Sequence, residues 1–342
     1  MTRKIRTAVV GLGRMGLRHL EIARSAGLGI VGAADIFEEA RQRAAATISL
    51  PQDKIYSDPA KMLEALRAEC VIVATTAPSH AAIVKAAAAN GAKFILCEKP
   101  MAASLAECDS MIEACRQAGA RLAVNHQMRF MDQYVIPKKI AQSETLGGLR
   151  SITAVTGNIG LAMNGTHYFE MVRFMTDDAP AEVSAWFSDD VVPNPRGAQF
   201  EDRAGCVRLT TKTGKRFYLD ASSDLGFGMH VSYGGRFGRI DVDELAGRMR
   251  LVARNADQRD QPTTRYGLPY ETREQVIEPA DVYGPTRAVL ESLLAESNYP
   301  DGADGRMAVE VLVAAYVSHE SGGNPVKLGA PEIPLDRHFP WA

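Results

Sequence analysis

Residues 5–16 read Ile-Arg-Thr-Ala-Val-Val-Gly-Leu-Gly-Arg-Met-Gly, an apolar run that leads directly into Gly11, Gly13 and Gly16. The run predicts a buried strand, and residues 14–26 predict a helix that starts at the glycines. In such a unit the first glycine permits a tight turn, the second lets the backbone approach a pyrophosphate, and the third allows close helix packing. Because a helix N-terminus attracts anions, this stretch predicts a dinucleotide-binding βαβ unit.

The next apolar run, residues 30–34, ends in Asp35. A carboxylate about 20 residues beyond the glycines can accept hydrogen bonds from the adenosine ribose hydroxyls, and it repels a 2′-phosphate. We therefore expect NAD as the cofactor, while Arg14 and Arg41 keep NADP possible. The alternative is a glycine turn between packed elements and a solvated aspartate. The residues expected at this end of the cofactor are Gly11, Gly13, Arg14, Met15, Gly16, Asp35 and Ile36.

Strand and helix patterns alternate over the first part of the chain. Further strands are expected at 71–74, 93–97 and 121–125, and helices at 38–46, 59–66 and 79–90. Ser104 followed by Glu107 is a capping-box pattern that starts another helix, which Gly119 ends. Such alternation predicts a parallel, doubly wound sheet. We expect this NAD(P)-binding Rossmann domain to cover residues 1–123.

The pattern changes after residue 123, where β-rich runs follow one another with few helices between them. Strands are expected at 149–156, 182–187, 205–211 and 216–220, and helices at 165–175, 284–296 and 302–321, before an extended tail from Pro325. Residues 191–201 and 255–270 are expected to be long polar loops. Together these patterns predict a C-terminal α+β domain over residues 124–342 with an open, mostly antiparallel sheet for substrate binding and oligomerisation.

Length and composition fit this division. A chain of 342 residues exceeds the size at which one core usually keeps growing. Hydrophobic residues make up 46% and charged residues 23%, as in ordinary globular proteins. With 39 basic and 41 acidic residues interspersed, no basic patch points to nucleic acid or an acidic membrane. The expected partner is a small molecule.

The five cysteines form no CxxC pair and are odd in number, which argues against a disulfide framework or a structural zinc site. No metal is expected. The N-terminal apolar run is too short for a signal peptide, and no apolar stretch approaches the roughly 18 residues of a membrane span. We therefore expect a cytoplasmic protein without a membrane segment.

At Glu98-Lys99-Pro100 the sequence begins to resemble the glucose-fructose oxidoreductase, inositol dehydrogenase and MocA family, abbreviated Gfo/Idh/MocA. The resemblance extends over essentially the whole chain. The motifs that carry it are the three glycines, Asp35, Ala74-Thr75-Thr76 with His80, Glu98-Lys99-Pro100, Arg129-Phe130 and Gly165-Thr166-His167-Tyr168-Phe169-Glu170. The resemblance implies that Thr75, Thr76, His80, Glu98 and Lys99 also belong to the cofactor site.

The resemblance implies hydride transfer between the cofactor and a secondary alcohol or ketone, commonly on a sugar, a sugar nucleotide or a cyclitol. Lys99 matches the catalytic lysine beside the nicotinamide, and His167 matches a second catalytic group. Oxidation of an alcohol requires a base for the hydroxyl proton, and histidine can exchange protons near neutral pH. By themselves, Lys99 would be a solvated lysine and His167 a capping or packing histidine.

The resemblance also implies a substrate pocket. Arg129 and Asn158 match pocket positions, although an interdomain ion pair and a turn, respectively, are equally compatible with them. Tyr283, at a helix start, is a further candidate or a packing residue. Family members that oxidise polyols often carry an aspartate four residues before the histidine, where this chain has Met163. The neighbouring Asn164 can hydrogen-bond a substrate hydroxyl, but it cannot relay a proton.

These patterns leave three hypotheses for function. The leading one is a dehydrogenase of a carbohydrate or cyclitol. In the second, a tightly bound nucleotide serves net non-redox chemistry or hydride transfer between sugars, and in the third the chain is a non-catalytic, cofactor-binding regulator. The presence of both Lys99 and His167 favours an enzyme. The resemblance further implies a homodimer or homotetramer, formed through the C-terminal sheet.

Overall fold

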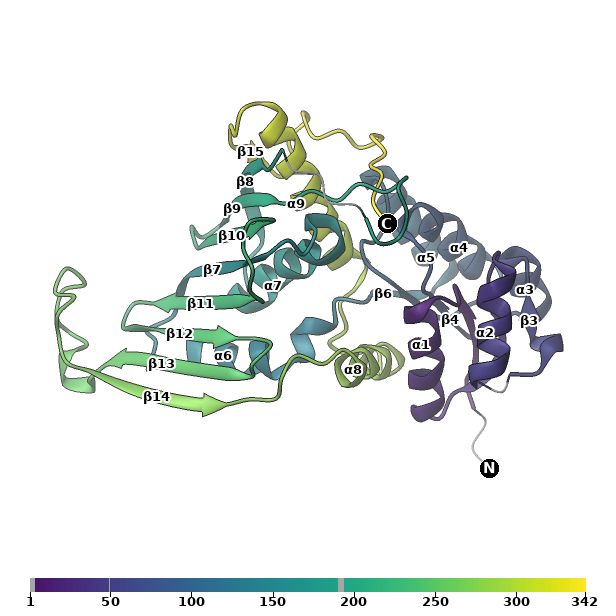
Figure 1. Cartoon of the computed structure of the whole chain (residues 1–342), viewed down its shortest axis with the longest axis horizontal. Coiled ribbons are helices and arrows are strands. Elements are labelled where there is room, and N and C mark those ends of the chain that lie inside the picture. The colour runs from purple at the N-terminus through teal and green to yellow at the C-terminus, as the bar shows by residue number, and fades with distance from the viewer. Residues whose placement is uncertain (1–3, 49, 190–193) are drawn as a thin grey trace. The chain divides into compact units, whose positions relative to one another are not determined.

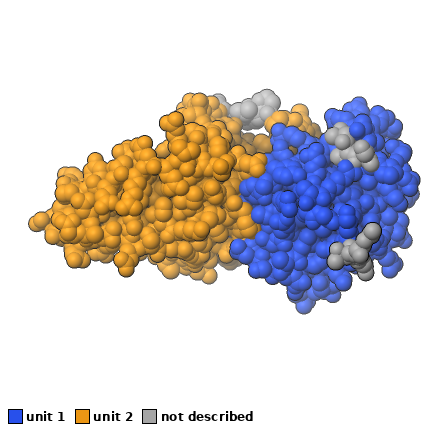
Figure 2. Space-filling model, turned by 90° about the horizontal axis from the view of Figure 1, so that it is seen from below, with its two compact units in different colours: residues 1–127, 282–309, 334–342 blue, residues 128–281, 310–333 orange. Residues whose placement is uncertain are grey.

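The computed structural model describes residues 4–48, 50–189 and 194–342, which form two compact units (Figure 2). Unit 1 contains the described residues up to 127 together with 282–309 and 334–342, and unit 2 contains those of 128–281 and 310–333. A single division after residue 123 therefore does not separate the units. Two segments from the C-terminal part of the sequence fold with the N-terminal part because they pack on its sheet and helices.

Unit 1 is built on a parallel sheet with the strand order β3-β2-β1-β4-β5-β6. Its strands are β1 (Arg6–Val10), β2 (Gly29–Ala34), β3 (Ile55–Tyr56), β4 (Cys70–Val73), β5 (Phe94–Cys97) and β6 (Arg121–Val124). Its helices are α1 (Arg14–Ser25), α2 (Glu38–Ile48), the 3-10 turn η1 (Gln52–Lys54), α3 (Pro59–Leu66), α4 (Ala77–Ala89), α5 (Leu105–Ala118), α8 (Tyr283–Leu294) and the start of α9 (Gly302–Glu320). This order is that of a Rossmann fold, which confirms the predicted fold class.

Local signals in the sequence set the helix ends in unit 1. The Ser104 side chain accepts a hydrogen bond from the Glu107 amide at 3.2 Å, and Gly119 follows α5 with a φ of 67°. Asp58 accepts from the amides of Ala60 and Lys61 at the start of α3. These bonds satisfy amides that have no partner inside the helix, so the predicted helix starts and ends are confirmed.

Unit 2 is built on a second sheet, with the order β14-β13-β12-β11-β7-β10-β9-β8-β15. Its strands are β7 (Leu149–Gly157), β8 (Pro180–Phe187), β9 (Gly205–Thr211), β10 (Arg216–Ser222), β11 (His230–Gly235), β12 (Gly238–Asp243), β13 (Arg248–Arg254), β14 (Tyr270–Val276) and β15 (Val326–Lys327). β7 and β10 are parallel and the other neighbours antiparallel, so the sheet is mostly antiparallel, as predicted. The remaining elements of this unit are η2 (Gln127–Phe130) except its first residue, α6 (Asp132–Ala141), the π-helical turn η3 (Leu161–Gly165), α7 (Thr166–Thr176), the 3-10 turn η4 (Ala256–Gln258) and the end of α9.

One face of the second sheet is buried and the other is exposed. In β9 and β10 the apolar residues Val207, Leu209, Phe217 and Leu219 are buried, whereas Tyr218 is 38% exposed. The alternation follows from the period of two along a strand. β14 is an edge strand of this sheet (Figure 1), and all seven of its residues are exposed.

A buried carboxylate joins three elements of unit 2. Glu244, in the turn after β12, accepts hydrogen bonds from the hydroxyls of Tyr134 in α6 and Tyr168 in α7, the latter at 2.9 Å. Burial raises the pKa of Glu244 to about 7, although the two tyrosine hydrogen bonds act in the opposite direction. The cluster therefore fixes α7 against the turn at the cost of burying an acid.

The C-terminal tail also packs in an ordered way. The amide of Phe339 donates to the carbonyl of Ala103 at 3.0 Å, and the amide of Ala106 donates to the carbonyl of Leu335 at 2.9 Å. Trp341 is fully buried, and its ring stacks on that of Phe339 with 4.5 Å between centroids. The tail therefore contributes an aromatic core element to unit 1. Among the described residues, no helix has the length and apolar character needed to cross a bilayer.

The substitution Trp341→Ala is expected to lower the free energy of unfolding by about 3–5 kcal/mol, because a large aromatic side chain leaves a cavity in a packed site. Denaturation in urea, followed by circular dichroism, measures the change. Leu335→Ala in the same tail is the matched control, since Leu335 is 49% exposed, and its effect is expected to stay within about 0.5 kcal/mol. Equal effects of the two variants would contradict the role given to Trp341.

Glu244→Gln is expected to change how stability depends on pH. The folded state holds the Glu244 proton up to about pH 7, whereas the ordinary value is 4.5. The contribution of Glu244 to the free energy of unfolding is thus complete below pH 4.5. It is lost as the pH rises from 4.5 through 7, and the free energy of unfolding falls by roughly 3 kcal/mol at most. Urea denaturation at a series of pH values should show this decline in the wild type and in Glu274→Gln, a control on the exposed strand β14, but not in Glu244→Gln. Parallel curves for all three proteins would refute it.

Candidate active site

The glycine turn after β1 has the shape that a dinucleotide requires. Gly11 has a φ of 91°, and a Cβ atom there would overlap the backbone at Ala74. A Cβ on Gly16 would overlap the carbonyl of Gly11, whereas one on Gly13 would meet nothing within 4 Å. Gly11 and Gly16 thus allow close packing, and Gly13 leaves open space beside the start of α1. The N-cap residue Gly13 has no side chain to bind the first amides of α1, and the first turn of this helix contains no acid, so these amides can receive an anion.

Asp35 lies directly beside this turn. Its carboxylate accepts hydrogen bonds from the amides of Leu12 at 2.7 Å and Phe37 at 2.9 Å. Arg41 donates to the carbonyls of Asp35 and Ile36 and to the carboxylate of Glu38. The arrangement fixes a carboxylate at the end of β2, where the ribose of a dinucleotide is held in this fold. The residues present therefore fit NAD.

The turns that follow β4 and β5 are joined through His80. The buried imidazole has Nε2 at 3.1 Å from the carbonyl of Thr75 and Nδ1 at 3.1 Å from the carbonyl of Pro100. The Thr75 hydroxyl also accepts a hydrogen bond from Ser79 at 2.7 Å. Burial lowers the pKa of His80, although its backbone partners act in the opposite direction. Because His80 is enclosed in this way, its position supports a role in shaping the site.

Glu98 is held by other elements of unit 1. Its carboxylate lies 2.7 Å from Nε2 of the buried His19 in α1 and accepts a hydrogen bond at 2.8 Å from Asn125, which follows β6. Burial acts to raise the pKa of Glu98, but the hydrogen bond and attraction of His19, the charge of Lys99 and the Asn125 bond outweigh it and lower the pKa to about 2. Glu98 thus anchors the segment that carries Lys99.

The predicted residues of unit 2 surround the start of α7. His167 is buried in the first turn of this helix. Arg129 forms a buried ion pair with Glu170, which lies one helical turn after His167. Both residues belong to unit 2, so this ion pair lies within one unit. Asn158 accepts a hydrogen bond from the Gly160 amide at 2.9 Å, and Asn164 donates to the carbonyl of Ile159 at 2.7 Å. Both asparagines therefore shape the turn that leads into α7.

Tyr283 was expected in the C-terminal domain, but it lies in unit 1 at the first residue of α8. The sequence did not reveal this because the segment is more than 150 residues away from the Rossmann strands on which α8 packs. Sequence analysis also missed Asp202, whose carboxylate binds the amides of Ala162 and Met163. Asp202 and the amides that it binds are about 40 residues apart in the sequence, so no local pattern indicates their contact.

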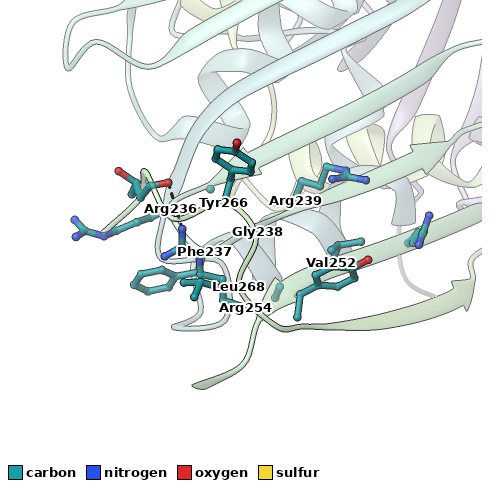
Figure 3. Close-up of a pocket in the computed structure, with 13 residues that line it drawn as sticks. Arg236, Phe237, Gly238, Arg239, Val252, Arg254, Tyr266 and Leu268 are labelled. Atoms are coloured by element: carbon teal, nitrogen blue, oxygen red, sulfur yellow. Dashed lines mark hydrogen bonds between the residues drawn. The ribbon is translucent and has the colours of Figure 1, made fainter. Parts of the chain in front are cut away.

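A groove of about 400 Å³ lies at the far end of the second sheet (Figure 3). It is lined by Gly235, Arg236, Phe237, Gly238, Arg239, Arg250, Val252, Ala253, Arg254, Thr263, Tyr266, Leu268 and Tyr270. None of the predicted site residues belongs to it. Arg254 donates to carbonyls of Gln261, Pro262, Thr263 and Arg265, so it fixes the polar loop expected at 255–270. Part of the other expected loop, residues 191–193, lies outside the described residues.

Within the described residues no group of three or more histidine, cysteine or acidic side chains could hold a metal ion.

Comparison with known proteins agrees with the fold and the motifs. Residues 5–126 match the model of the GFO_IDH_MocA family, described as an oxidoreductase family with an NAD-binding Rossmann fold. The myo-inositol 2-dehydrogenase of Thermotoga maritima is 27% identical over 335 residues, which cover 92% of this chain and 96% of that protein. The D-apiose dehydrogenase of Paraburkholderia graminis is 27% identical over 275 residues, or 73% of this chain and 68% of that protein.

A solved structure shows the same fold. It is a crystal structure of an oxidoreductase from Agrobacterium radiobacter in complex with NAD+, L-tartaric acid and magnesium. The TM-score is 0.80 at 18% identity, with 96% of this chain and 99% of that chain covered. The glycine turn, the strand-end carboxylate and the Glu98-Lys99-Pro100 segment agree with these similarities. Residues 5–126 match the NAD-binding Rossmann fold of the Gfo/Idh/MocA oxidoreductase family, and the two relatives described above are dehydrogenases.

Proposed function

We propose that this chain transfers hydride between NAD and a secondary alcohol or ketone of a sugar, a sugar derivative or a cyclitol. The observation that carries the proposal is the anchoring of Lys99. Glu98 on one side is bound by His19 and Asn125, and the carbonyl of Pro100 on the other side contacts His80. A catalytic base needs a fixed position, and these contacts supply one at the carboxyl end of β5.

Unit 1 is the proposed NAD-binding domain. The proposed contacts are Gly11, Gly13, Arg14, Met15, Gly16, Asp35, Ile36, Thr75, Thr76, His80, Glu98 and Lys99. The nicotinamide of a bound NAD would accept or donate the hydride. Asp35 would hold the adenosine ribose, and because its carboxylate repels a 2′-phosphate, NADP is the less favoured cofactor.

Unit 2 is the proposed substrate and oligomerisation domain. During alcohol oxidation Lys99 removes the hydroxyl proton, and His167 orients the substrate and relays the proton. Arg129, Asn158, Asn164 and Tyr283 complete the proposed substrate site. The names of the relatives support the substrate class, because inositol and apiose are both polyhydroxylated compounds. The same proposal places the protein in the cytoplasm, which its five free cysteines support.

Met163 favours a second candidate function. It stands where polyol-oxidising members often carry an aspartate, so one proton-transfer group is missing from the pattern. An enzyme that retains its nucleotide and returns the hydride, either to the same molecule or to a second sugar, fits this departure. A cofactor-binding regulator also fits it. Release of nucleotide from the purified, heat-denatured protein would identify the retained-cofactor form.

Assembly through the second sheet is part of the proposal. On the exposed face of this sheet, Trp186 is 52% exposed and Tyr218 is 38% exposed. Aromatic residues are enriched in protein–protein interfaces. A hollow of about 290 Å³ lies beside Trp186 and Tyr218 between β7, β8, β9 and β10. A homodimer or homotetramer would cover this face.

Lys99→Ala and His167→Ala are each expected to lower kcat by about 10²–10⁴-fold, the usual contribution of a positioned acid or base. Reduction of NAD and NADP, followed by nicotinamide absorbance with a panel of sugars, sugar acids and cyclitols, measures turnover. NAD affinity is measured separately by calorimetry. Lys93→Ala, an exposed lysine just before the same strand, is the control and should retain full turnover. Unchanged kcat in the Lys99 or His167 variant would disprove its role.

Trp186→Glu combined with Tyr218→Glu is expected to convert the oligomer to a smaller species, because burying two carboxylates in an interface is unfavourable. Light scattering coupled to gel filtration gives the mass. Tyr266→Glu, at a residue that is 95% exposed at the far end of the same sheet, is the control and should leave the mass unchanged. Dissociation of the oligomer by Tyr266→Glu alone would show that the interface lies elsewhere than on the proposed face.

A further inference from the structure

Three consecutive amides at the start of the segment leading into α7 are bound by one short piece of chain. The Leu161 amide donates to the carbonyl of Arg203 at 2.9 Å. The amides of Ala162 and Met163 donate to the two carboxylate oxygens of Asp202 at 2.7 and 2.8 Å. Such amides have no partner within the helix itself. Residues 202 and 203, which precede β9, therefore cap the turn that carries Asn164 and His167.

Gly160 makes this approach possible. It has a φ of 72°, and a Cβ atom at this position would overlap the Asp202 carboxylate. Its carbonyl in turn accepts hydrogen bonds from the amides of Asn164 and Gly165, both at 2.9 Å. The turn is thus held on one side by its own backbone and on the other by Asp202. Removing either set of contacts would leave the start of α7 free to change conformation.

The bonds require a carboxylate specifically. Each oxygen of Asp202 accepts from a different amide, whereas an asparagine would direct an N–H group at one of them. A negative charge is also stabilised at the start of a helix. Met163 stands where related polyol dehydrogenases often carry an aspartate. Here a carboxylate from a distant segment binds the Met163 amide instead.

We propose that Asp202 is a positioning residue for the reaction. It fixes residues 161–165 through their amides, so that Asn164 and His167 are presented in one conformation. It also provides a carboxylate at the beginning of the catalytic segment, which position 163 lacks. The inference rests on the proposed function, since His167 is the group that Asp202 positions.

The first test does not depend on activity and compares Asp202→Asn with Asp58→Asn. Asp58 is a matched control, because it also accepts from two amides at a helix start, that of α3 in unit 1. Hydrogen exchange at Ala162 and Met163 is expected to become roughly tenfold to a hundredfold faster in Asp202→Asn, since hydrogen bonds to a charged group are lost. It should remain unchanged in Asp58→Asn. Unchanged exchange in Asp202→Asn would overturn the proposal.

The second test separates positioning from mere stabilisation. Asp202→Asn should lower kcat by about tenfold or more, with KM for NAD within twofold of the wild type, and Asp202→Ala should lower kcat further. Asp58→Asn should behave as the wild type does. Faster exchange together with an unchanged kcat would overturn the positioning role and leave a purely structural one.

If the wild-type protein turns over no substrate, the proposed function fails, and the remaining part of the inference, that Asp202 sets the position of His167, is tested without activity. The imidazole resonances of the seven histidines, with that of His167 assigned from its absence in His167→Ala, then decide the matter. Displacement of the His167 resonance in Asp202→Asn but not in Asp58→Asn would support the positioning role. An unmoved resonance would overturn it.

Discussion

The buried carboxylate of Glu98 is the constraint on which the architecture of unit 1 depends. It joins α1, which begins at the glycine turn, to the end of β5 and to Asn125 after β6. Asn125 also lies 3.5 Å from the hydroxyl of Thr286 in α8. A buried charge is unfavourable unless it is paired and hydrogen-bonded. These elements can therefore satisfy Glu98 only in one arrangement, and that arrangement fixes Lys99 beside it.

The same principle organises the helix of unit 2 that carries His167. Three carboxylates hold it. Asp202 binds the amides before its first turn, Glu170 is paired with Arg129, and Glu244 accepts the hydroxyl of Tyr168. Asp202 and Glu244 come from other parts of the chain, whereas Glu170 belongs to the helix and binds Arg129 outside it. Tertiary contacts therefore hold the helix that carries His167.

Much of the fold follows from local patterns. Gly11 and Gly16 permit the packing of α1 on β1, Ser104 and Gly119 bound α5, and the alternation in β9 predicts that strand correctly. The prediction omitted α6 and the strands β11 to β14. Strands β11, β12 and β13 do alternate buried and more exposed residues, so their pattern was present in the sequence and was overlooked. All residues of β14 are exposed, so this strand lacks the apolar period of a half-buried strand.

By itself, the sequence determined the Rossmann unit, the glycine turn with Asp35 and the motif segments around Lys99 and His167, because each of these depends on residues close together in the chain. Only the tertiary structure decided that α8 and the C-terminal tail fold with unit 1, that Arg129 pairs with Glu170, and that Asp202 binds the Met163 amide. These contacts join residues that are dozens to hundreds of positions apart. Their formation depends on burial and on the satisfaction of charges within the complete fold, which no local pattern encodes.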